Sequence, residues 1–463
     1  MPLPDAVEAV PMARIAVVCQ GDRMRAALIE LADAGVAEFE TSSKTDASEV
    51  SESLRRLHAA GTAEAAPALL AVPRPLAELE LARRADLLAG EVELERKSAA
   101  AATRGPFLAL LGWCPAAELN MLRTRLEPLG AGVVEIARPA FVEPPTLLRT
   151  PRAAESFRPL VETYGTVRYR DIDPTPFTAI SFVLMFGMMF ADAGHGLLLA
   201  AAGLFLRFSH NPRLKSLRPS WPIPLAAGLV AAAFGLAYGE FFGPTGVVPV
   251  LWLRPLQNPL ELLVVGIAVG AVLLAISYVI GSVNRWREGG FQAALYSGSG
   301  IAGTLLFAGV GGLALGLFWQ TVTLAIGSLL PVIAGLVLLF IGYFVQAGKG
   351  GTGVLEAVVE TVNSVIRLGA NSISFARLAA FGMVHAAIGS LVWMGTVALI
   401  GAGWWLAAIP IFILGNAVGF LLELLVAGIQ AMRLEYYELF SRIYSGEGRP
   451  FKPWHITVLK EAS

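Results

Sequence analysis

The sequence predicts a mainly α-helical, polytopic membrane protein with eight transmembrane segments and a small N-terminal α/β domain that carries a helical arm. Of its 463 residues, 55% are hydrophobic and only 15% are charged, whereas soluble domains carry roughly 25% charged residues. Residues 1–172 have an ordinary load of charged side chains, and apolar runs dominate from there on. Those runs reach the ~20 residues that a membrane helix needs.

The first 140 residues are predicted to form a soluble head. Met1 to Pro11 contains acids and prolines but no apolar core of a signal peptide, so the head is expected to stay in the cytoplasm. Its expected strands cover residues 13–18, 36–40, 108–113 and 132–136, and its expected helices cover residues 23–35, 47–60, 75–102 and 116–129. The helical stretches 47–60 and 75–102 form the arm, and residues 141–172 form a linker with a proline-rich start.

The membrane domain is predicted to span residues 173–463 and to end in a short cytoplasmic tail. Six clear membrane spans are expected at 221–243, 258–284, 294–318, 321–346, 371–400 and 404–432. The first apolar run, 177–206, is interrupted by Phe190-Ala-Asp-Ala-Gly-His-Gly196 and is either one long helix or a hairpin of two short ones.

The distribution of basic residues distinguishes one long helix from a hairpin, because cytoplasmic loops are enriched in Lys and Arg. A hairpin at Asp192–Gly196 places the basic connections, the head and the C-terminus on one side of the membrane. These connections hold Arg207, Arg213, Lys215, Arg218, Arg285, Arg287, Lys349, Arg367, Arg442, Arg449 and Lys452. A single long helix would instead require export of the head. We therefore predict the hairpin and eight segments.

A few charged side chains lie inside apolar helices, where each costs at least ~2.5–3.5 kcal/mol and normally faces a partner or a water-filled cavity. Arg377 lies in one span and Glu423 in the next. Gln430 and Arg433 share a helical face with Glu423, and His385 lies two turns beyond Arg377. The last two spans therefore each carry a polar stripe.

Ion translocation is the function that this pattern favours. An arginine stays charged at working pH, so it can lower the pKa of a passing carboxylate and displace its proton. The alternative is a buried ion pair, of Glu423 with Arg377 or Arg433, that only fixes helix packing. His385 alone is more often a packing residue.

Three polar residues at segment ends have competing interpretations. Asp192 and His195 resemble a site, but at a glycine-rich turn the more common role is to cap backbone groups. Glu240 lies at the end of a span, where solvation at the membrane interface is the expected role.

Composition and motifs exclude other classes of function. A net charge of −1 gives no reason to expect nucleic-acid binding. Gly342 to Lys349 has five residues between its glycines where a phosphate loop has about four, so no ATP-binding motif is expected. No cofactor or metal is expected either, because metal-binding spacing is absent among His58, His195, His210, His385 and His455.

Several ordered motifs resemble subunit a (subunit I) of V-type and archaeal-type rotary ATPases. The resemblance covers about residues 140–463. The motifs that carry it are, in chain order, Asp171-Ile-Asp-Pro-Thr-Pro-Phe177, Met185 to Gly196, Tyr238-Gly-Glu-Phe-Phe-Gly243, Asn371 to Leu378, Gln430-Ala-Met-Arg433 and Gly446 to Pro453. The head is about half the length usual for the family. Ala191 and Phe375-Ala-Arg377 replace commoner family residues.

The resemblance implies a non-catalytic stator in a proton-transporting two-sector ATPase. Its last two helices would be long and tilted and would form two half-channels against a rotating proteolipid c-ring. Arg377 matches the family's essential arginine and Arg433 its second arginine, with Glu423, Gln430 and His385 at channel-lining positions. Glu356 and Glu360 lie where a cytoplasmic half-channel would open, and Asp192, His195 and Glu240 are further candidates.

The resemblance also implies partners and a location. The partners are peripheral stalk subunits, a central-stalk cap subunit, the V1/A1 ATPase sector and the lipid bilayer, in a prokaryotic plasma membrane. Three alternatives stay open: sodium as the coupling ion, a secondary ion-coupled transporter, and a scaffold that conducts no ion. A transporter is expected to show an internal repeat, and none is visible in the sequence.

Overall fold

The computed structural model describes residues 8–40, 49–61, 66–139, 142–348 and 351–459. These residues form two compact units. The membrane unit contains residue 8 and residues 149–447, and the head unit contains residues 9–148 and 448–459. The C-terminal segment, expected to be a tail of the membrane domain, thus belongs to the head.

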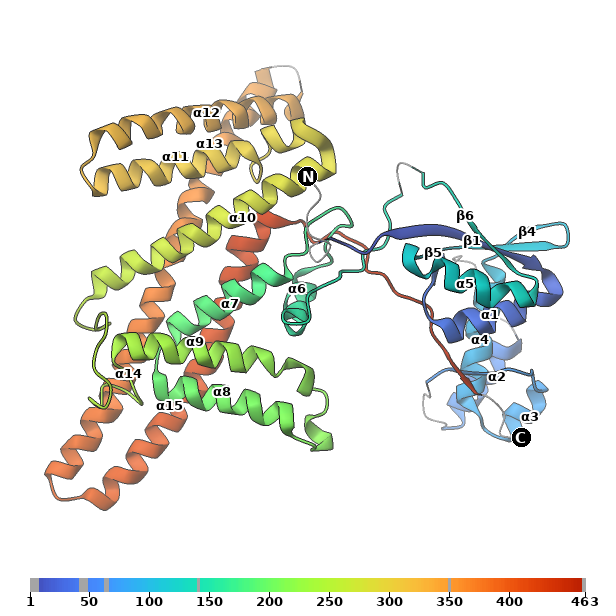
Figure 1. Cartoon of the computed structure of the whole chain (residues 1–463), viewed down its shortest axis with the longest axis horizontal. Coiled ribbons are helices and arrows are strands. Elements are labelled where there is room, and N and C mark those ends of the chain that lie inside the picture. Colours follow the sequence, from blue (N-terminus) through green and yellow to red (C-terminus); the bar gives the residue numbers. More distant parts are fainter. Residues whose placement is uncertain (1–7, 41–48, 62–65, 140–141, 349–350, 460–463) are drawn as a thin grey trace. The chain divides into compact units, whose positions relative to one another are not determined.

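The head is built on an antiparallel sheet with the strand order β2-β5-β1-β6 (Figure 1). Alternate residues of β1, Ala13, Ile15, Val17 and Cys19, are buried in one core with the apolar faces of two helices. The sheet consists of β1 (Met12–Gln20), β2 (Glu38–Phe39), β4 (Ala102–Arg104), β5 (Phe107–Pro115) and β6 (Gly132–Glu135), and the helices are α1 (Met24–Ala34) and α5 (Leu119–Leu126). This small α/β region confirms the class predicted for the N-terminal part.

The arm is also present, with a break that the sequence pattern did not indicate. The expected helix 75–102 is divided into α3 (Leu76–Leu81) and α4 (Ala85–Ala99), and Arg83 between them has a left-handed φ of 51°. The helix α2 (Glu49–Ala59) packs against α4. Residues 47 and 48 of the expected helix 47–60 lie outside the described part of the chain.

The C-terminal segment completes the head through long-range contacts. Strand β7 (Thr457–Leu459) pairs in parallel with β3 (Ala68–Leu70). Trp454 is buried against Phe39 in an edge-to-face contact, with ring centroids 6.2 Å apart. Neither strand was predicted, because a three-residue strand has too few side chains to display a period.

The membrane unit begins with two short apolar helices, α7 (Thr175–Met189) and α8 (Ala193–Phe208), joined at Asp192. Both pack against α9 (Pro222–Tyr238). The approach is close enough that a Cβ on Gly235 of α9 would lie 2.1 Å from the backbone nitrogen of Ala193. The turn in this apolar run matches the predicted hairpin. A short helix, α6 (Arg158–Tyr164), precedes it.

Three further helices differ from the expected spans mainly at their ends. Helix α10 (Pro259–Tyr296) continues through Arg285 and Arg287, which were expected in a loop, and it bends at Gly290, where φ is 75°. Helix α11 (Ile301–Phe318) therefore begins later than predicted. It packs along α12 (Val322–Ala347).

The last part of the unit contains a helix that the span prediction missed. Helix α13 (Gly351–Ser374) occupies a region expected to be a basic connection, and Phe375 separates it from α14 (Ala376–Gly401). Helix α14 lies side by side with α15 (Trp405–Leu434) (Figure 1). A π-helical turn (Glu435–Phe440) and a short helix α16 (Ser441–Ile443) follow.

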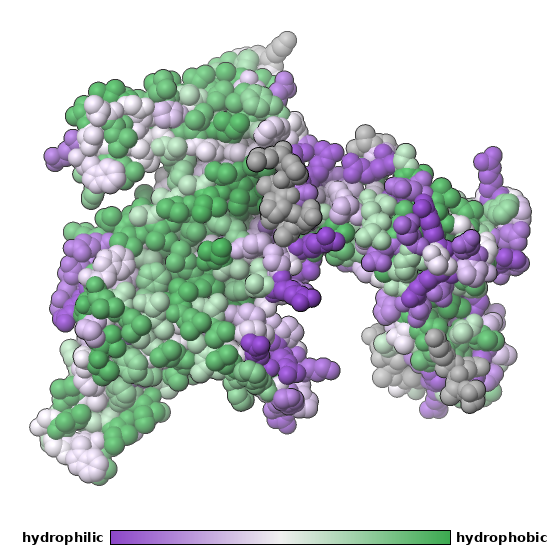
Figure 2. Space-filling model, viewed as in Figure 1, coloured by the Kyte–Doolittle hydropathy of each residue, from purple (hydrophilic) through white to green (hydrophobic). Residues whose placement is uncertain are grey.

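Six helical stretches among the described residues are long and apolar enough to cross a membrane. They lie at Arg218–Tyr238, Pro259–Tyr296, Ile301–Phe318, Val322–Ala347, Gly351–Gly401 and Trp405–Ile443. The surface of this unit is predominantly hydrophobic in Figure 2. The chain is therefore a membrane protein with several apolar helical spans.

Candidate functional site

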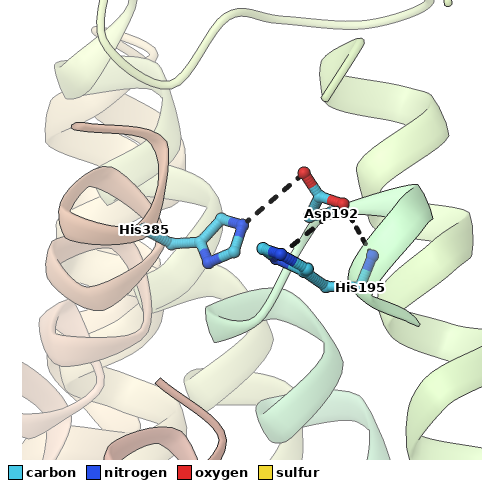
Figure 3. Close-up of side chains that lie close together, drawn as sticks. All are labelled: Asp192, His195 and His385. Atoms are coloured by element: carbon cyan, nitrogen blue, oxygen red, sulfur yellow. Dashed lines mark hydrogen bonds and ion pairs between the residues drawn. The ribbon is translucent and has the colours of Figure 1, made fainter. Parts of the chain in front are cut away.

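Four buried polar side chains from α7–α8, α14 and α15 meet inside the membrane unit. We call Asp192, His195, His385 and Glu423 the histidine cluster. They are 0%, 4%, 5% and 8% exposed, respectively. Figure 3 shows a ring nitrogen of His385 and one of His195 facing the Asp192 carboxylate. Residues far apart in the sequence are therefore brought together in the interior of the membrane unit.

Asp192 caps the start of α8 and also holds a neighbouring loop. Its Oδ1 accepts hydrogen bonds from the backbone N–H groups of His195 (2.8 Å) and Phe242 (3.0 Å). Its Oδ2 accepts from the N–H of Gly243 (2.8 Å). The capping role considered from the sequence is thus present, but the same carboxylate also faces two histidines. Three hydrogen bonds to one charged group fix its position firmly.

His385 joins the two carboxylates of the cluster. Its Nδ1 is paired with Glu423 of α15, and its Nε2 lies 4.0 Å from Oδ2 of Asp192. Glu423 thus pairs with a histidine rather than with an arginine. Among the described residues, Arg377 and Arg433 form no ion pair with Glu423, which contradicts the packing alternative considered above.

His195 is the least satisfied member of the cluster. Its Nδ1 lies 4.0 Å from Asp192, and neither ring nitrogen has a hydrogen-bond partner within the described structure. Aromatic rings of Phe190, Phe242 and Phe420 surround it. A buried imidazole without a partner is uncommon and calls for an explanation.

A second group of polar side chains lies further along α14 and α15. We call Arg377, Gln430, Arg433 and Glu438 the arginine cluster: Arg433 and Glu438 are the charged groups near Arg377, and Gln430 lies one helical turn before Arg433 on α15. One polar atom of each of Arg377 (Nη1), Gln430 (Oε1) and Glu438 (Oε2) is buried without a hydrogen bond. This cluster therefore retains donors and acceptors that the described part of the chain does not satisfy.

Glu240 lies beside the histidine cluster at the end of α9. It is 6% exposed, so the structure does not support the expected solvation at the interface. Its backbone carbonyl accepts a hydrogen bond from Ala193 (2.9 Å). It also lines a cavity of about 370 Å³ together with Arg254 and Ser390. A polar cavity thus adjoins the turn that carries Asp192.

Glu356 and Glu360 are not brought into either cluster. Both lie on α13, where Glu356 is exposed and Glu360 forms an ion pair with Arg367 at 3.4 Å. Side chains at these exposed positions are available to solvent or to another subunit.

Two buried carboxylates were missed by the sequence analysis. Glu435 is 1% exposed and accepts hydrogen bonds from Ser181 of α7 at 2.9 and 2.8 Å. Glu438 belongs to the arginine cluster. Both follow Arg433 after the apolar run has ended, so their position suggested a solvated helix end. The π-helical turn and its packing against α7 bury them instead.

The two clusters lie at different depths along the same helix pair. Eight residues separate Arg377 from His385 and ten separate Glu423 from Arg433, which corresponds to roughly 12 and 15 Å of helix. Along α14, Ser390 at the Glu240 cavity, His385 and the half-buried Arg377 thus follow one another.

Comparisons with known proteins found a family model and several relatives that this chain resembles. Residues 99–220 match the family described as "V-type ATPase 116kDa subunit family". The A-type ATP synthase subunit I of Pyrococcus horikoshii is 27% identical over 361 residues, which cover 74% of this chain and 53% of the relative. That of Halobacterium salinarum is 29% identical over 380 residues, covering 68% and 52%.

A third relative gives the same result. The A-type ATP synthase subunit I of Methanocaldococcus jannaschii is 28% identical over 384 residues, which cover 74% of this chain and 54% of the relative. The chain thus spans about half the length of the curated relatives it matches.

Proposed function

Because this chain belongs to the V/A-type ATPase subunit a/I family, we propose that it is the stator of the membrane sector of a rotary ATPase. In this role it carries protons between each side of the membrane and a rotating proteolipid c-ring. The proton flow is coupled to ATP hydrolysis or synthesis in the V1/A1 sector. Peripheral stalk subunits and a central-stalk cap subunit would bind the head.

The observation that carries the proposal is the arginine cluster beside the histidine cluster. Arg377 has a buried nitrogen without a partner, on a helix pair whose outer face is apolar. A carboxylate arriving on a neighbouring subunit would satisfy it. The arginine would then lower the pKa of that carboxyl and release its proton, while its own charge prevents a direct leak.

The helix lengths support eight membrane segments, with the first two short. Helices α7 and α8 have 15 and 16 residues, or ~22–24 Å at 1.5 Å per residue. Helices α14 and α15 have 26 and 30 residues, or ~39 and ~45 Å. The hydrocarbon core is ~30 Å thick, so the long pair would tilt.

This topology assigns each half-channel to one side of the membrane. With the basic segments and the head in the cytoplasm, Glu240 and the histidine cluster lie toward the outer side of a prokaryotic plasma membrane. Glu423 and His385 would pass protons between the Glu240 cavity and the level of Arg377. On the inner side, Glu438 and the exposed Glu356 and Glu360 lie nearer the cytoplasm.

The experiment is ATP-driven proton uptake by reconstituted complexes carrying Arg377→Ala. We expect uptake to fall ~100-fold or more, since no other fixed charge occupies this position. Arg367→Ala is the matched control, because Arg367 lies on the exposed side of α13 in a surface ion pair worth little. Normal uptake by an assembled Arg377→Ala complex would contradict the proposal.

Other outcomes identify the alternatives. Loss of assembly in Arg377→Ala with normal coupling of the remaining complexes would indicate a scaffold. Uptake that requires Na⁺ and persists with a protonophore would make sodium the coupling ion. Coupled solute transport by the purified chain alone would indicate a secondary transporter.

A further inference from the structure

We propose that Asp192, His195 and His385 form a binding site for one divalent transition-metal ion, with Zn²⁺ as the best match. The spacing of histidines in the sequence gave no reason to expect such a site. The fold brings the three residues together, and their ligand atoms all lie within 4.8 Å of one another. All three side chains are buried.

The distances are close to those of a bound ion. Zn²⁺ lies ~2.0–2.2 Å from nitrogen and oxygen ligands, which places the ligand atoms of a tetrahedral site about 3.4 Å apart. Nε2 of His385 and Oδ2 of Asp192 are 4.0 Å apart, as are Nδ1 of His195 and Oδ1 of Asp192. Small rotations of the two imidazoles close the remaining gap.

Glu423 orients the imidazole of His385 for metal binding. A metal-bound histidine usually donates its other ring N–H to a carboxylate, which fixes the tautomer and the orientation of the ring. The pairing of Nδ1 with Glu423 has this form. Nε2, which faces Asp192 at 4.0 Å (Figure 3), is the ring nitrogen left to bind the ion. The second carboxylate therefore belongs to the outer shell of the site.

His195 supplies the independent evidence for a ligand. It is 4% exposed, and neither of its ring nitrogens has a hydrogen bond. Asn416 of α15 lies beside the ring and donates one amide hydrogen to the carbonyl of Phe412, and it forms no hydrogen bond with either ring nitrogen of His195 within the described structure. A metal ion held with Asp192 would give this imidazole the partner that the described chain does not provide.

Charge and ligand type favour a transition metal over other cations. Asp192 and Glu423 together offset the two positive charges of the ion, so the buried site is neutral with both imidazoles uncharged. Two imidazoles and one carboxylate suit Zn²⁺, whereas Mg²⁺ and Ca²⁺ prefer oxygen ligands alone. Asp192 Oδ2 accepts only one hydrogen bond, so it keeps a lone pair for the ion.

A cavity lies close to the cluster. The cavity of about 370 Å³ is lined by Glu240, whose backbone carbonyl binds the N–H of Ala193, next to Asp192. A bound ion would occupy Nε2 of His385 and so block the proposed proton route. That consequence rests on the proposed function, whereas metal binding itself does not.

The test uses Co²⁺ as a visible probe, added to the purified full-length chain in detergent. We expect about one Co²⁺ per chain, with the intense d–d absorption of a tetrahedral site, and displacement by Zn²⁺. His195→Gln should remove this absorption and weaken binding at least ~10-fold. The matched control His210→Gln changes an exposed histidine and should bind as the unaltered chain does.

A second variant covers the case in which His195→Gln does not fold. His195→Cys offers a thiolate in place of an imidazole, so a thiolate-to-cobalt charge-transfer band should appear. An unaltered Co²⁺ spectrum in a folded His195→Gln chain, or no saturable tetrahedral Co²⁺ in the unaltered chain, would overturn the proposal. So would the absence of the charge-transfer band in a folded His195→Cys chain.

Discussion

The histidine cluster and the arginine cluster differ in how their polar and charged groups are paired. In the histidine cluster both carboxylates have partners, since Asp192 accepts three backbone hydrogen bonds and Glu423 pairs with His385. In the arginine cluster Arg377, Gln430 and Glu438 each retain a buried polar atom without a partner. Buried groups are normally satisfied, so a group from outside the chain is expected at the arginine cluster, whereas in the histidine cluster His195 alone lacks a hydrogen bond and is the proposed ligand of a metal ion.

The largest expected effect in the histidine cluster is on transport. Glu423→Gln removes the charge paired with His385 and the acid that would exchange protons at this level, so proton uptake by assembled complexes should fall ~10–100-fold. Glu155→Gln, at an exposed position before α6 and outside the proposed proton route, should leave uptake near the unaltered rate. Equal rates for both variants would remove the histidine cluster from the route.

The second largest expected effect is a loss of stability on substitution of Asp192. It distinguishes the hydrogen-bonded histidine cluster from the arginine cluster. Asp192→Asn replaces a charged acceptor of three backbone N–H groups by a neutral amide, which should cost ~2–3 kcal/mol of unfolding free energy. Thermal unfolding of the purified chain in detergent measures this. An unchanged midpoint would mean that the three hydrogen bonds do not hold the α8 turn and the Gly243 loop together.

A buried carboxyl outside both clusters provides a titration test. Asp171 precedes α7, and burial together with the nearby Glu288 raises the pKa of Asp171 to about 8. The folded state thus holds this proton more tightly than the unfolded state, where the pKa is ~3.9. Its contribution to stability is present at low pH and is lost as pH rises toward 8, by at most ~1.4 kcal/mol per pH unit.

Asp171→Asn should remove that dependence. Midpoints of thermal unfolding measured between pH 5 and pH 8 (~3 pH units, within the window set by the two pKa values) should decline less steeply in the variant than in the unaltered chain. Parallel declines would show that Asp171 ionises freely in the folded protein.

The smallest effect on stability is expected in the arginine cluster. Gln430→Leu removes an acceptor that has no hydrogen bond, so unfolding free energy should change by less than ~0.5 kcal/mol. Proton uptake should nevertheless fall, because the polar stripe on α15 is interrupted. Destabilisation comparable to that of Asp192→Asn would show that Gln430 already has a partner and would weaken the contrast between the clusters.

Much of the fold was predictable because membrane helices and their connections leave strong signals. Apolar runs predicted the positions of α9 to α12, α14 and α15, and the Gly-rich interruption predicted the turn between α7 and α8. The predicted ends of the helices were less accurate, since α10 extends to Tyr296 whereas the predicted span ended at residue 284. Helix α13 was missed because polar residues in it resemble a loop when composition is averaged along the chain.

The site was predictable as a set of residues but not as two assemblies. Helical spacing placed Glu423, Gln430 and Arg433 on one face, and it placed His385 two turns from Arg377. It carried no information on which residues of different helices meet, so the His385–Glu423 pair and the approach of Asp192 depended on the fold. Glu435 and Glu438 were missed because burial beyond an apolar run has no sequence signal.

The pairing of β3 with β7 shows the same limit in the head. Nearly four hundred residues (Leu70 to Thr457) separate the two strands, and neither is long enough to show alternation. Local patterns report local structure, whereas contacts between distant short segments are determined by the packing of the whole unit.

The central claim is that the arginine cluster faces a rotating ring, and site-specific cross-linking tests it directly. Both natural cysteines are buried in the head, so Leu425→Cys on the exposed apolar face of α15 provides a unique thiol in the membrane unit. Val337→Cys, exposed on α12, is the control. In assembled complexes whose proteolipid subunit carries a cysteine next to its carboxylate, we expect a disulfide with Cys at 425 and none with Cys at 337. Cross-linking from position 337 but not from position 425 would contradict the account.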